Sequence, residues 1–402
     1  MRILKEEKDV MFGGCHVIFV GDFFQLLHVG SGQPLFKGNT LQFGAINKAI
    51  FLNVSHRFND DHAYGEIMRR FRIGLVTKDD IKKINTRFIE NDNVSLPPIT
   101  RLRCACYTNN ERNAYTNTIF IQHLMATHIK ASNHANTNPD TVPCPDHTCI
   151  IKASMRYRNK KSGPFNCNMY NRLLDECGDA SIKNSNNSFV DPALKFFHNI
   201  PLMTLDNSRI DEGLANGTPC RGLYLQLKDG CHFVKENWEG YIINTISVDD
   251  VDHMVCMIEC DPSQQPTYFT VKPTNGLCNV TLKHFNNIAL EPINISYLPI
   301  NSNISTTGHK LQGSTLDSLV INSWTFNVQH WAYVVLSRVK KLNSLVLNAI
   351  LDENRHYSAN SELVRWETNM KKIIEQKTFQ DRGKSDYNRY AAEEIRYNGK
   401  MP

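Results

Sequence analysis

The sequence of 402 residues lacks a long hydrophobic run, a regular cysteine spacing and a strong excess of one charge. No apolar run approaches the roughly 18 residues that a membrane-spanning helix needs, and no signal-peptide-like apolar region follows the charged start MRILKEEKDV. These absences predict an intracellular protein with no membrane partner. The 12 cysteines are scattered along the chain, which favours reduced thiols over a disulfide framework.

The charge balance decides little about function. The 45 Lys and Arg residues exceed the 40 Asp and Glu residues by only +5, which permits nucleic-acid binding without requiring it. With 41% hydrophobic and 21% charged residues, the chain can bury a sizeable core divided over two or three domains. Motifs must therefore indicate the function.

The first third of the chain alternates expected strands and helices. Residues 15 to 20 form a short apolar run that ends in Gly-Asp, which is typical of a buried strand opening onto a ligand crevice. A basic, mostly helical stretch spans about residues 64 to 88, and residues 102 to 107 read as another strand. The Thr-Asn-Asn at 108 to 110 is expected to cap a helix running to about Leu124. This alternation predicts a parallel α/β sheet.

The composition changes in the middle of the chain. From about residue 131 to 188, Asn, Ser, Pro and Lys accumulate, which predicts a long and partly flexible connection. Short β-like runs then occur near Leu202, Leu223, Tyr241 and Met254, separated by turn residues, and they predict a small β-barrel. Residues 294 to 347 return to strand and helix, and the tail from about 352 is polar and charged.

Two segments carry residues suited to phosphate chemistry. In VIFVGDFFQL, Asp22 and Gln25 follow the first expected strand, where they could sense a phosphate-bound metal or an attacking water, or could simply cap the strand. Farther along, TTGHKLQGSTLDSLVINSW and WAYVVLSRVKKLNSLVL place a polar cluster and Arg338 next to apolar runs. A lone arginine after a strand is usually a salt-bridge partner, but this combination suits the coupling of phosphates to a nucleic-acid backbone.

These motifs resemble those of one helicase family. GDFFQL, HRF at residues 56 to 58, LMTLDN with GLANGT, GHKLQG and YVVLSRVK occur in the order and spacing seen in Pif-type (petite integration frequency) DNA helicases of superfamily one. The resemblance is strongest to the helicases of Helitron transposons and their cellular relatives, and it covers about residues 12 to 350. It implies an ATP-dependent helicase that moves 5′ to 3′ on single-stranded DNA and unwinds duplex forks in repair, recombination, telomere maintenance or transposition. The expected compartment is then the nucleus or the mitochondrion.

The resemblance also implies roles for individual residues. The expected ATP-site residues are Asp22 and Gln25 in the third helicase motif, Arg57 in the fourth, Gln312 and Gly313 in the fifth, and Arg338 in the sixth. Among them, Gln25, Arg57 and Arg338 would act on the γ-phosphate, with ATP and Mg²⁺ as cofactors. Thr307 and His309, with Lys310 beside them, match positions that hold the single-strand backbone.

The expected fold is α/β, a RecA-like P-loop NTPase helicase core with an inserted small β-barrel. Residues 1–51 would be the end of a partial first RecA-like domain. The second such domain would be complete and split into 52–200 and 292–351 around a barrel at 201–291, with a tail at 352–402. The run from Gly213 to Thr218 is expected to supply only turn structure.

Two departures from the family pattern bear on activity. The 402 residues contain no GxxxxGK[ST] motif, and the Asp-Glu pair expected before Phe12 to hold magnesium is absent. In addition, Leu27-His28 stands where the family has prolines. The sequence therefore predicts the C-terminal part of a helicase, inactive by itself. The alternatives are a non-catalytic remnant that binds single-stranded DNA or a protein partner, and a RecD-like exonuclease subunit.

Two further features allow two interpretations each. Cys144, His147 and Cys149, with Cys167 and Cys177, could bind zinc or be ordinary reduced thiols. The basic residues between Arg69 and Arg87 could contact phosphates or form a solvated helix face.

Overall fold

The computed structural model describes residues 15, 17, 18, 20–26, 50–52, 55–133, 148–157, 180–183, 189–238, 240–259, 265–282, 288–289, 293–326, 328–357 and 359–381. The chain forms two compact units. The first comprises residues 1–84, 325–342 and 351–402, and the second comprises 85–324 and 343–350. Among the described residues, no helix combines the length and hydrophobicity that crossing a bilayer requires.

A parallel sheet lies in the second unit, as the alternating pattern predicts. Its four strands have the order β16 (Ser305–Thr307), β1 (Cys104–Cys106), β17 (Leu319–Ile321) and β18 (Leu345–Leu347), and every pair is parallel. All residues of β1, β17 and β18 are buried. Such continuously apolar strands are typical of a parallel sheet covered on both faces.

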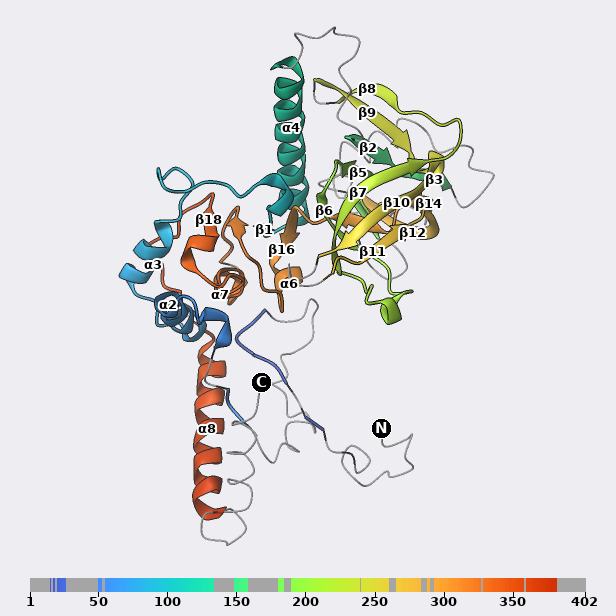
Figure 1. The fold of residues 1–402 in the computed structure, drawn as a ribbon. Coiled ribbons are helices and arrows are strands. Elements are labelled where there is room, and N and C mark those ends of the chain that lie inside the picture. Colours follow the sequence, from blue (N-terminus) through green and yellow to red (C-terminus); the bar gives the residue numbers. More distant parts are fainter. Residues whose placement is uncertain are drawn as a thin grey trace. The chain divides into compact units, whose positions relative to one another are not determined.

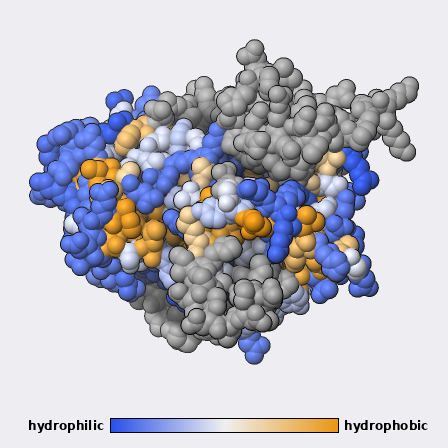
Figure 2. All heavy atoms as spheres, turned by 90° about the horizontal axis from the view of Figure 1, so that it is seen from above, coloured by the Kyte–Doolittle hydropathy of each residue, from blue (hydrophilic) through white to orange (hydrophobic). Residues whose placement is uncertain are grey.

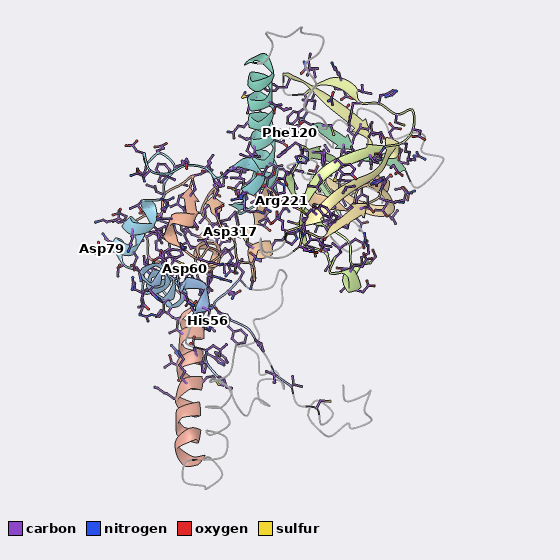
Figure 3. The ribbon with its side chains drawn as sticks, in the orientation of Figure 1. His56, Asp60, Asp79, Phe120, Arg221 and Asp317 are labelled. Atoms are coloured by element: carbon purple, nitrogen blue, oxygen red, sulfur yellow. The ribbon has the colours of Figure 1, made fainter. Side chains whose placement is uncertain are left out.

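Helix α4 (Asn109–Asn133) follows β1 and packs against β1 and β16 (Figure 1). Its expected cap is present, because the Thr108 hydroxyl accepts a hydrogen bond of 3.2 Å from the Glu111 N–H. The helix continues beyond the expected end at Leu124, since the following residues include good helix formers and no Gly or Pro. Phe120, labelled on α4 in Figure 3, is fully buried. Its ring packs edge-on against Trp238, with the ring centroids 5.6 Å apart.

The rest of the second unit is rich in strands. They are β2 (Cys149–Lys152), β3 (Ser154–Tyr157), β4 (Ala180–Lys183), β5 (Ala193–Phe196), β6 (Ile200–Thr204), β7 (Pro219–Leu227), β8 (Val234–Trp238), β9 (Tyr241–Ser247), β10 (Val251–Ile258), β11 (Tyr268–Val271), β12 (Thr274–Leu282), β13 (Ile288–Ala289), β14 (Ile293–Tyr297) and β15 (Ile300–Ser302). The expected runs near residues 202, 223, 241 and 254 lie in β6, β7, β9 and β10. These strands form three sheets, with the orders β11-β10-β7-β6-β15, β13-β12-β14-β3 with β4 on β12, and β5-β2-β9-β8. Closure into a barrel stays a prediction.

The segment 131–188, expected to be a flexible connection, contains regular structure where it is described. It includes β2, β3 and β4, of which β3 pairs with β14 and β4 pairs with β12. The partner of β4 lies about 100 residues farther along the chain and the partner of β3 about 140, so no local pattern could reveal the pairing. The run from Gly213 to Thr218 is a turn, as expected, because Gly213 and Gly217 take left-handed conformations with φ of 81° and 92°.

The first unit is helical where it is described. It contains η2 (His56–Phe58), α2 (His62–Ile73), α3 (Lys78–Asn85), α7 (Trp331–Leu336) and α8 (Ser361–Asp381). Asp61 caps α2 by accepting a hydrogen bond of 2.9 Å from the Tyr64 N–H, and Gly74 ends it with φ of 76°. Helix α8 occupies the region expected only to be a polar tail. In the second unit, short 3-10 turns occur at η3 (Ile99–Arg101), η6 (Ile210–Glu212) and η7 (Val248–Asp250), and η8 (Leu342–Ser344) lies at the boundary of the two units.

The strand expected at residues 15 to 20 is not present among its described residues. Positions 15, 17, 18 and 20 have no regular structure, and the side chains of Ile18 and Val20 are 86% and 89% exposed. An apolar run becomes a buried strand only when neighbouring strands pair with it, and no described strand pairs here. Elsewhere on the surface, Figure 2 shows small groups of hydrophobic residues among hydrophilic ones.

Candidate functional site

The turn at residues 22 to 25 presents an acid and an amide from the first unit. The Asp22 carboxylate accepts a hydrogen bond of 3.1 Å from the Phe24 N–H, and the Asp22 carbonyl accepts one of 3.2 Å from the Gln25 N–H. Phe24 is buried and anchors the turn, while Asp22 and Gln25 stay half-buried. This geometry leaves both polar side chains at an accessible surface.

The Asp22 carboxylate also contacts a cation. Its Oδ1 lies 3.0 Å from Nη2 of Arg72, whose guanidinium covers the Phe24 ring at 4.2 Å. Burial alone would lower the pKa of Arg72, but Asp22 outweighs it and the pKa is raised. Arg72 therefore fixes the orientation of the turn, which the sequence did not indicate.

Two arginines meet near this turn. Arg57 in η2 donates a hydrogen bond of 2.6 Å from Nη1 to the Ser337 carbonyl. Arg338, next in the chain, is only 2% exposed and donates from Nε to the Val334 carbonyl at 2.7 Å. Arg338 was expected after a strand, but it follows the helix α7, because the buried residues of WAYVVL are those that a helical turn places together.

The surroundings of these arginines disfavour positive charge. Burial and, to a smaller extent, the nearby Arg57 lower the pKa of Arg338 to about 10, although Tyr333 and Asp22 act in the opposite direction. Burial also lowers the pKa of Arg57. An anion bound beside the two guanidinium groups would offset both effects, and planar guanidinium groups match the oxygens of a phosphate. The structure therefore brings Asp22, Arg57 and Arg338 together, with Gln25 in the same turn, and their role at an ATP site stays a prediction.

Two further residues of this cluster were not predicted from the sequence. Tyr333 in α7 lies with its hydroxyl 3.5 Å from Asp22, and burial raises its pKa to about 12. His330 precedes α7 in a left-handed conformation with φ of 63°, and its ring packs edge-on against Phe24 at 5.5 Å. Its Nε2 is buried and has no hydrogen-bond partner among the described residues. Only the fold reveals these contacts.

The residues expected to hold a single strand lie in the second unit. Thr307 ends β16, and Gly308–Leu311 form the short helix α6. Below them, the Ser305 hydroxyl lies 2.6 Å from the Thr116 hydroxyl and donates at 2.7 Å to the Arg112 carbonyl. These buried hydrogen bonds hold the end of β16 against α4, so Thr307 is presented by a fixed element.

The side chains of α6 differ in their surroundings. Lys310 is an exposed residue, but its ammonium group lies 3.7 Å from the Met203 sulfur, in a partly buried contact. Burial of that group, with Arg112 nearby, lowers the pKa of Lys310. Burial also lowers the pKa of His309, which is half-buried. A nearby phosphate would favour the charged form of both residues.

Gln312 and Gly313 lie just after α6 and are exposed. Gly313 has φ of 87°, a conformation that side chains rarely adopt, so glycine is required for this turn. Gln312 and Gly313 belong to the second unit, whereas Asp22, Gln25, Arg57 and Arg338 belong to the first. Their meeting at one ATP site stays a prediction.

Most arginines of the basic stretch stabilise the fold. Arg70 forms a two-point ion pair with the buried Asp80, at 2.5 and 2.7 Å. Arg87 donates from Nε to the Leu345 carbonyl at 3.0 Å, and the exposed Arg69 pairs with Glu66 at 2.9 Å. The exposed Lys82 and Lys83, like Arg69, fit a solvated helix face.

Of the possible zinc ligands, Cys149 is buried in β2. Cys144, His147, Cys167 and Cys177 lie outside the described residues. Within the described part of the chain, no group of three or more His, Cys, Asp or Glu side chains could hold a metal ion.

Comparison with known proteins relates the fold to one group of enzymes. The chain matches no protein-family model and no curated protein sequence. Among solved structures, the Pif1 helicase of Candida albicans covers 88% of this chain and 67% of its own, with 15% identity and a TM-score of 0.54. A Bacteroides Pif1 in complex with ADP-AlF3 and single-stranded DNA covers 92% of this chain and 70% of its own, with 17% identity and a TM-score of 0.56.

The chain has the fold of the Pif1 helicases. A second Bacteroides Pif1 structure, bound to single-stranded DNA, agrees with a TM-score of 0.53 at 18% identity. At such low identity the likeness establishes the Pif1 fold, as the motifs predicted, and leaves the activity to be proposed.

Proposed function

We propose that this chain is the nucleotide-sensing and DNA-binding part of an ATP-dependent DNA helicase that moves 5′ to 3′ on single-stranded DNA. The observation that carries this proposal is the pair of Arg57 and Arg338 beside the turn of Asp22. Arg338 is 2% exposed and has a pKa of about 10, so it occupies an environment that an anion would improve. The Pif1 fold, found in a Bacteroides protein bound to ADP-AlF3 and single-stranded DNA, supports the same interpretation.

The residues present fit the terminal phosphate of ATP better than they fit magnesium. Arg57 and Arg338 offer guanidinium groups that would neutralise charge developing on the γ-phosphate, and Gln25 would sense whether that phosphate is present. ATP would supply the phosphoanhydride bond whose cleavage drives movement. Asp22 is the carboxylate of this turn and already pairs with Arg72, so the described residues supply no complete magnesium site and no step is assigned to that ion.

On the DNA side, Thr307, His309 and Lys310 would hold the phosphate backbone of a single strand. A hydroxyl, an imidazole and an ammonium group contact phosphates without reading base sequence. Gln312 follows directly on this group, so a response to nucleotide could pass along α6 to the strand. The proposed roles are repair, recombination, telomere maintenance or transposition at duplex forks, in the nucleus or the mitochondrion.

The second candidate is a protein that binds single-stranded DNA without catalysis. The absence of GxxxxGK[ST] from the 402 residues favours it, because the amides and lysine of that motif supply most of the phosphate grip in related enzymes. The DNA side, in contrast, depends on residues within one compact unit.

One experiment separates the two candidates. The genomic sequence upstream is read for an open frame encoding GxxxxGK[ST] and an Asp-Glu pair, and the longer chain is assayed for ATP hydrolysis with and without single-stranded DNA. The helicase proposal expects hydrolysis that depends on DNA. Equal rates with and without DNA would refute the coupling, and an upstream sequence with neither motif would favour the non-catalytic candidate.

A further inference from the structure

The five-stranded sheet of the second unit has one face in the core. Its opposite face is exposed at two tyrosines and covered near Arg221, which donates a hydrogen bond to the Thr100 carbonyl. The core face carries Leu202, Cys220, Met254, Cys256 and Phe269, all buried in one hydrophobic cluster. Because side chains alternate along a strand, their neighbours point to the opposite face. We call that opposite face, formed by Met203, Arg221, Tyr224, Val255, Met257 and Tyr268, the outer face.

The register of the strands arranges the outer face in rows. Met257 in β10 lies opposite Arg221 in β7 on one side and Tyr268 in β11 on the other. Val255, two residues earlier in β10, lies opposite Tyr224 in β7. Neighbouring strands are about 4.8 Å apart, so Arg221 and Tyr268 are separated by roughly 10 Å.

The two tyrosines of this face are exposed. Tyr224 is 46% exposed and Tyr268 is 59% exposed, while Val255 between them is only 8% exposed. An aromatic ring held on a rigid strand loses little conformational entropy when it stacks against another flat group. The arrangement therefore offers two rings on a firm base, spaced across three strands.

The outer face is continuous with the residues proposed to hold DNA. Met203 lies opposite Pro219 in β7, two residues before Arg221, and the Lys310 ammonium sits 3.7 Å from the Met203 sulfur. A strand whose phosphate contacts Lys310 would thus reach Arg221 and the tyrosines by crossing neighbouring β-strands of the same sheet. Figure 3 labels Arg221 on this sheet.

The charges near the outer face nearly balance. Lys272 is exposed at the end of β11, and Arg209 donates a hydrogen bond of 3.1 Å to the Thr270 carbonyl. Acidic groups are present but engaged: Glu259 pairs with Arg103 and Arg221, Glu212 pairs with Arg209, and Asp252 pairs with His253. Asp206 and Asp211 also lie near Arg209, so basic and acidic groups near the outer face are about equal in number. Stacking on the tyrosines, more than charge, would therefore hold a single strand on this face.

We propose that the outer face binds the bases of single-stranded DNA, which stack on Tyr224 and Tyr268 while the Thr307 to Lys310 segment holds the backbone. This inference rests on the proposed DNA binding and extends it with a second contact region. Stacking on aromatic rings is independent of base identity, which suits a protein that travels along DNA of any sequence.

The test compares oligonucleotides of two lengths on the 402-residue chain. Fluorescence anisotropy at low salt is measured with labelled oligothymidylates of about 4 and about 16 nucleotides, a span that covers typical single-strand sites. The double variant Tyr224→Ala, Tyr268→Ala should weaken binding of the long oligonucleotide by about 10-fold or more. It should leave the short one, held at Lys310, unchanged.

Three controls make the result specific. Tyr224→Phe with Tyr268→Phe keeps both rings and should bind normally. Ile242→Ala removes a side chain that is 69% exposed in β9, on another sheet, and should also bind normally. A long abasic oligonucleotide should bind the wild type as weakly as it binds the double alanine variant.

The outcomes separate this inference from the function on which it rests. Normal binding of the long oligonucleotide by the double alanine variant, together with loss of binding by Lys310→Ala, would overturn the stacking proposal and leave DNA binding intact. No binding of any oligonucleotide by the folded wild type would overturn both. A change of oligomeric state in light scattering, with DNA binding unchanged, would assign the outer face to contacts between copies of the chain instead.

Discussion

Replacing Arg338 by methionine should leave the protein as stable as before, or make it slightly more stable. The pKa of about 10, against an ordinary 12.5, corresponds to about 3 kcal/mol of unfavourable free energy for the charged side chain in the fold. The folded-state pKa lies below the unfolded one, so this cost is fully present at neutral pH and is relieved only between about pH 10 and 12.5.

The hydrogen bonds of Arg338 act in the other direction. Its Nε donates to the Val334 carbonyl at 2.7 Å, and its Nη2 donates to the Ser337 hydroxyl at 2.8 Å. Bonds of this kind contribute about 1 to 2 kcal/mol each. Methionine fills a similar volume and adds no charge, so we expect the free energy of unfolding to change by less than about 1 kcal/mol.

The assay combines urea unfolding with thermal unfolding in millimolar pyrophosphate, a soluble stand-in for the phosphates of ATP. An anion about 5-fold above its Kd stabilises the fold by about 1 kcal/mol. The wild type should therefore melt at a higher temperature in pyrophosphate, and Arg338→Met should not respond. Arg69→Met, on an arginine whose side chain is 61% exposed, is the control and should respond like the wild type.

Two outcomes would refute this reasoning. A decrease of more than about 3 kcal/mol in the free energy of unfolding of Arg338→Met would show that Arg338 stabilises the fold, and that its charge is not kept only to bind a ligand. Equal pyrophosphate responses in wild type and Arg338→Met would show that the anion binds elsewhere.

Three further predictions follow from the same structure. Arg70→Ala should destabilise the fold by about 3 kcal/mol in urea, because it leaves the Asp80 carboxylate buried, whereas Glu66→Ala, at an exposed pair, should cost under about 1 kcal/mol. Burial alone would raise the pKa of Asp80, but Arg70 lowers it. The stability contributed by the Arg70–Asp80 pair should therefore be present above about pH 4 and lost as the pH falls further. A difference in stability between wild type and Arg70→Ala that does not change with pH would contradict this prediction. Single-strand binding by residues 1 to 402 should weaken steeply as the salt concentration rises. Lys310→Ala should make the slope of log K against log salt concentration shallower by about 0.7. An unchanged slope would show that Lys310 contacts no phosphate. ATP binding by the same chain, measured by calorimetry, should be very weak because its sequence has no GxxxxGK[ST], and robust hydrolysis would overturn that argument.

The sequence predicted the features that depend on local patterns. Strand β1 and the cap of α4 were recognisable because a short apolar run and the Thr-Asn-Asn run at 108 to 110 indicate their structure within a few residues. The helix α8 was missed because its polar composition hid apolar positions at 363, 366 and 370, which recur with helical spacing. Leu363 is indeed buried, and Trp366 packs edge-on against Phe23 at 5.2 Å.

Features that depend on distant partners could not be predicted in this way. Arg72 lies fifty residues from Asp22, and Tyr333 lies more than three hundred residues from it, yet both contact its carboxylate. Sequence motifs identified Arg57 and Arg338 by resemblance, but not the burial that lowers their pKa values. The strand predicted at residues 15 to 20 is not found among its described residues for the same reason, because the burial of a strand depends on the strands beside it.

The path of the chain connects the group of residues around Arg338 with the group around Thr307. Strands β17 and β18 are parallel neighbours in the sheet of the second unit, and the chain between them leaves that unit at residue 325 and returns at residue 343. This excursion contains α7 and Arg338. At its ends, the Trp324 indole donates a hydrogen bond of 2.7 Å to the Ala349 carbonyl, which ties the exit and return segments together. The excursion thus begins and ends at two adjacent strands of a sheet whose far edge, β16, carries Thr307. If Arg338 and Thr307 have the proposed roles, this sheet gives a physical link between the nucleotide side and the DNA side, because a packed parallel sheet moves as one rigid element.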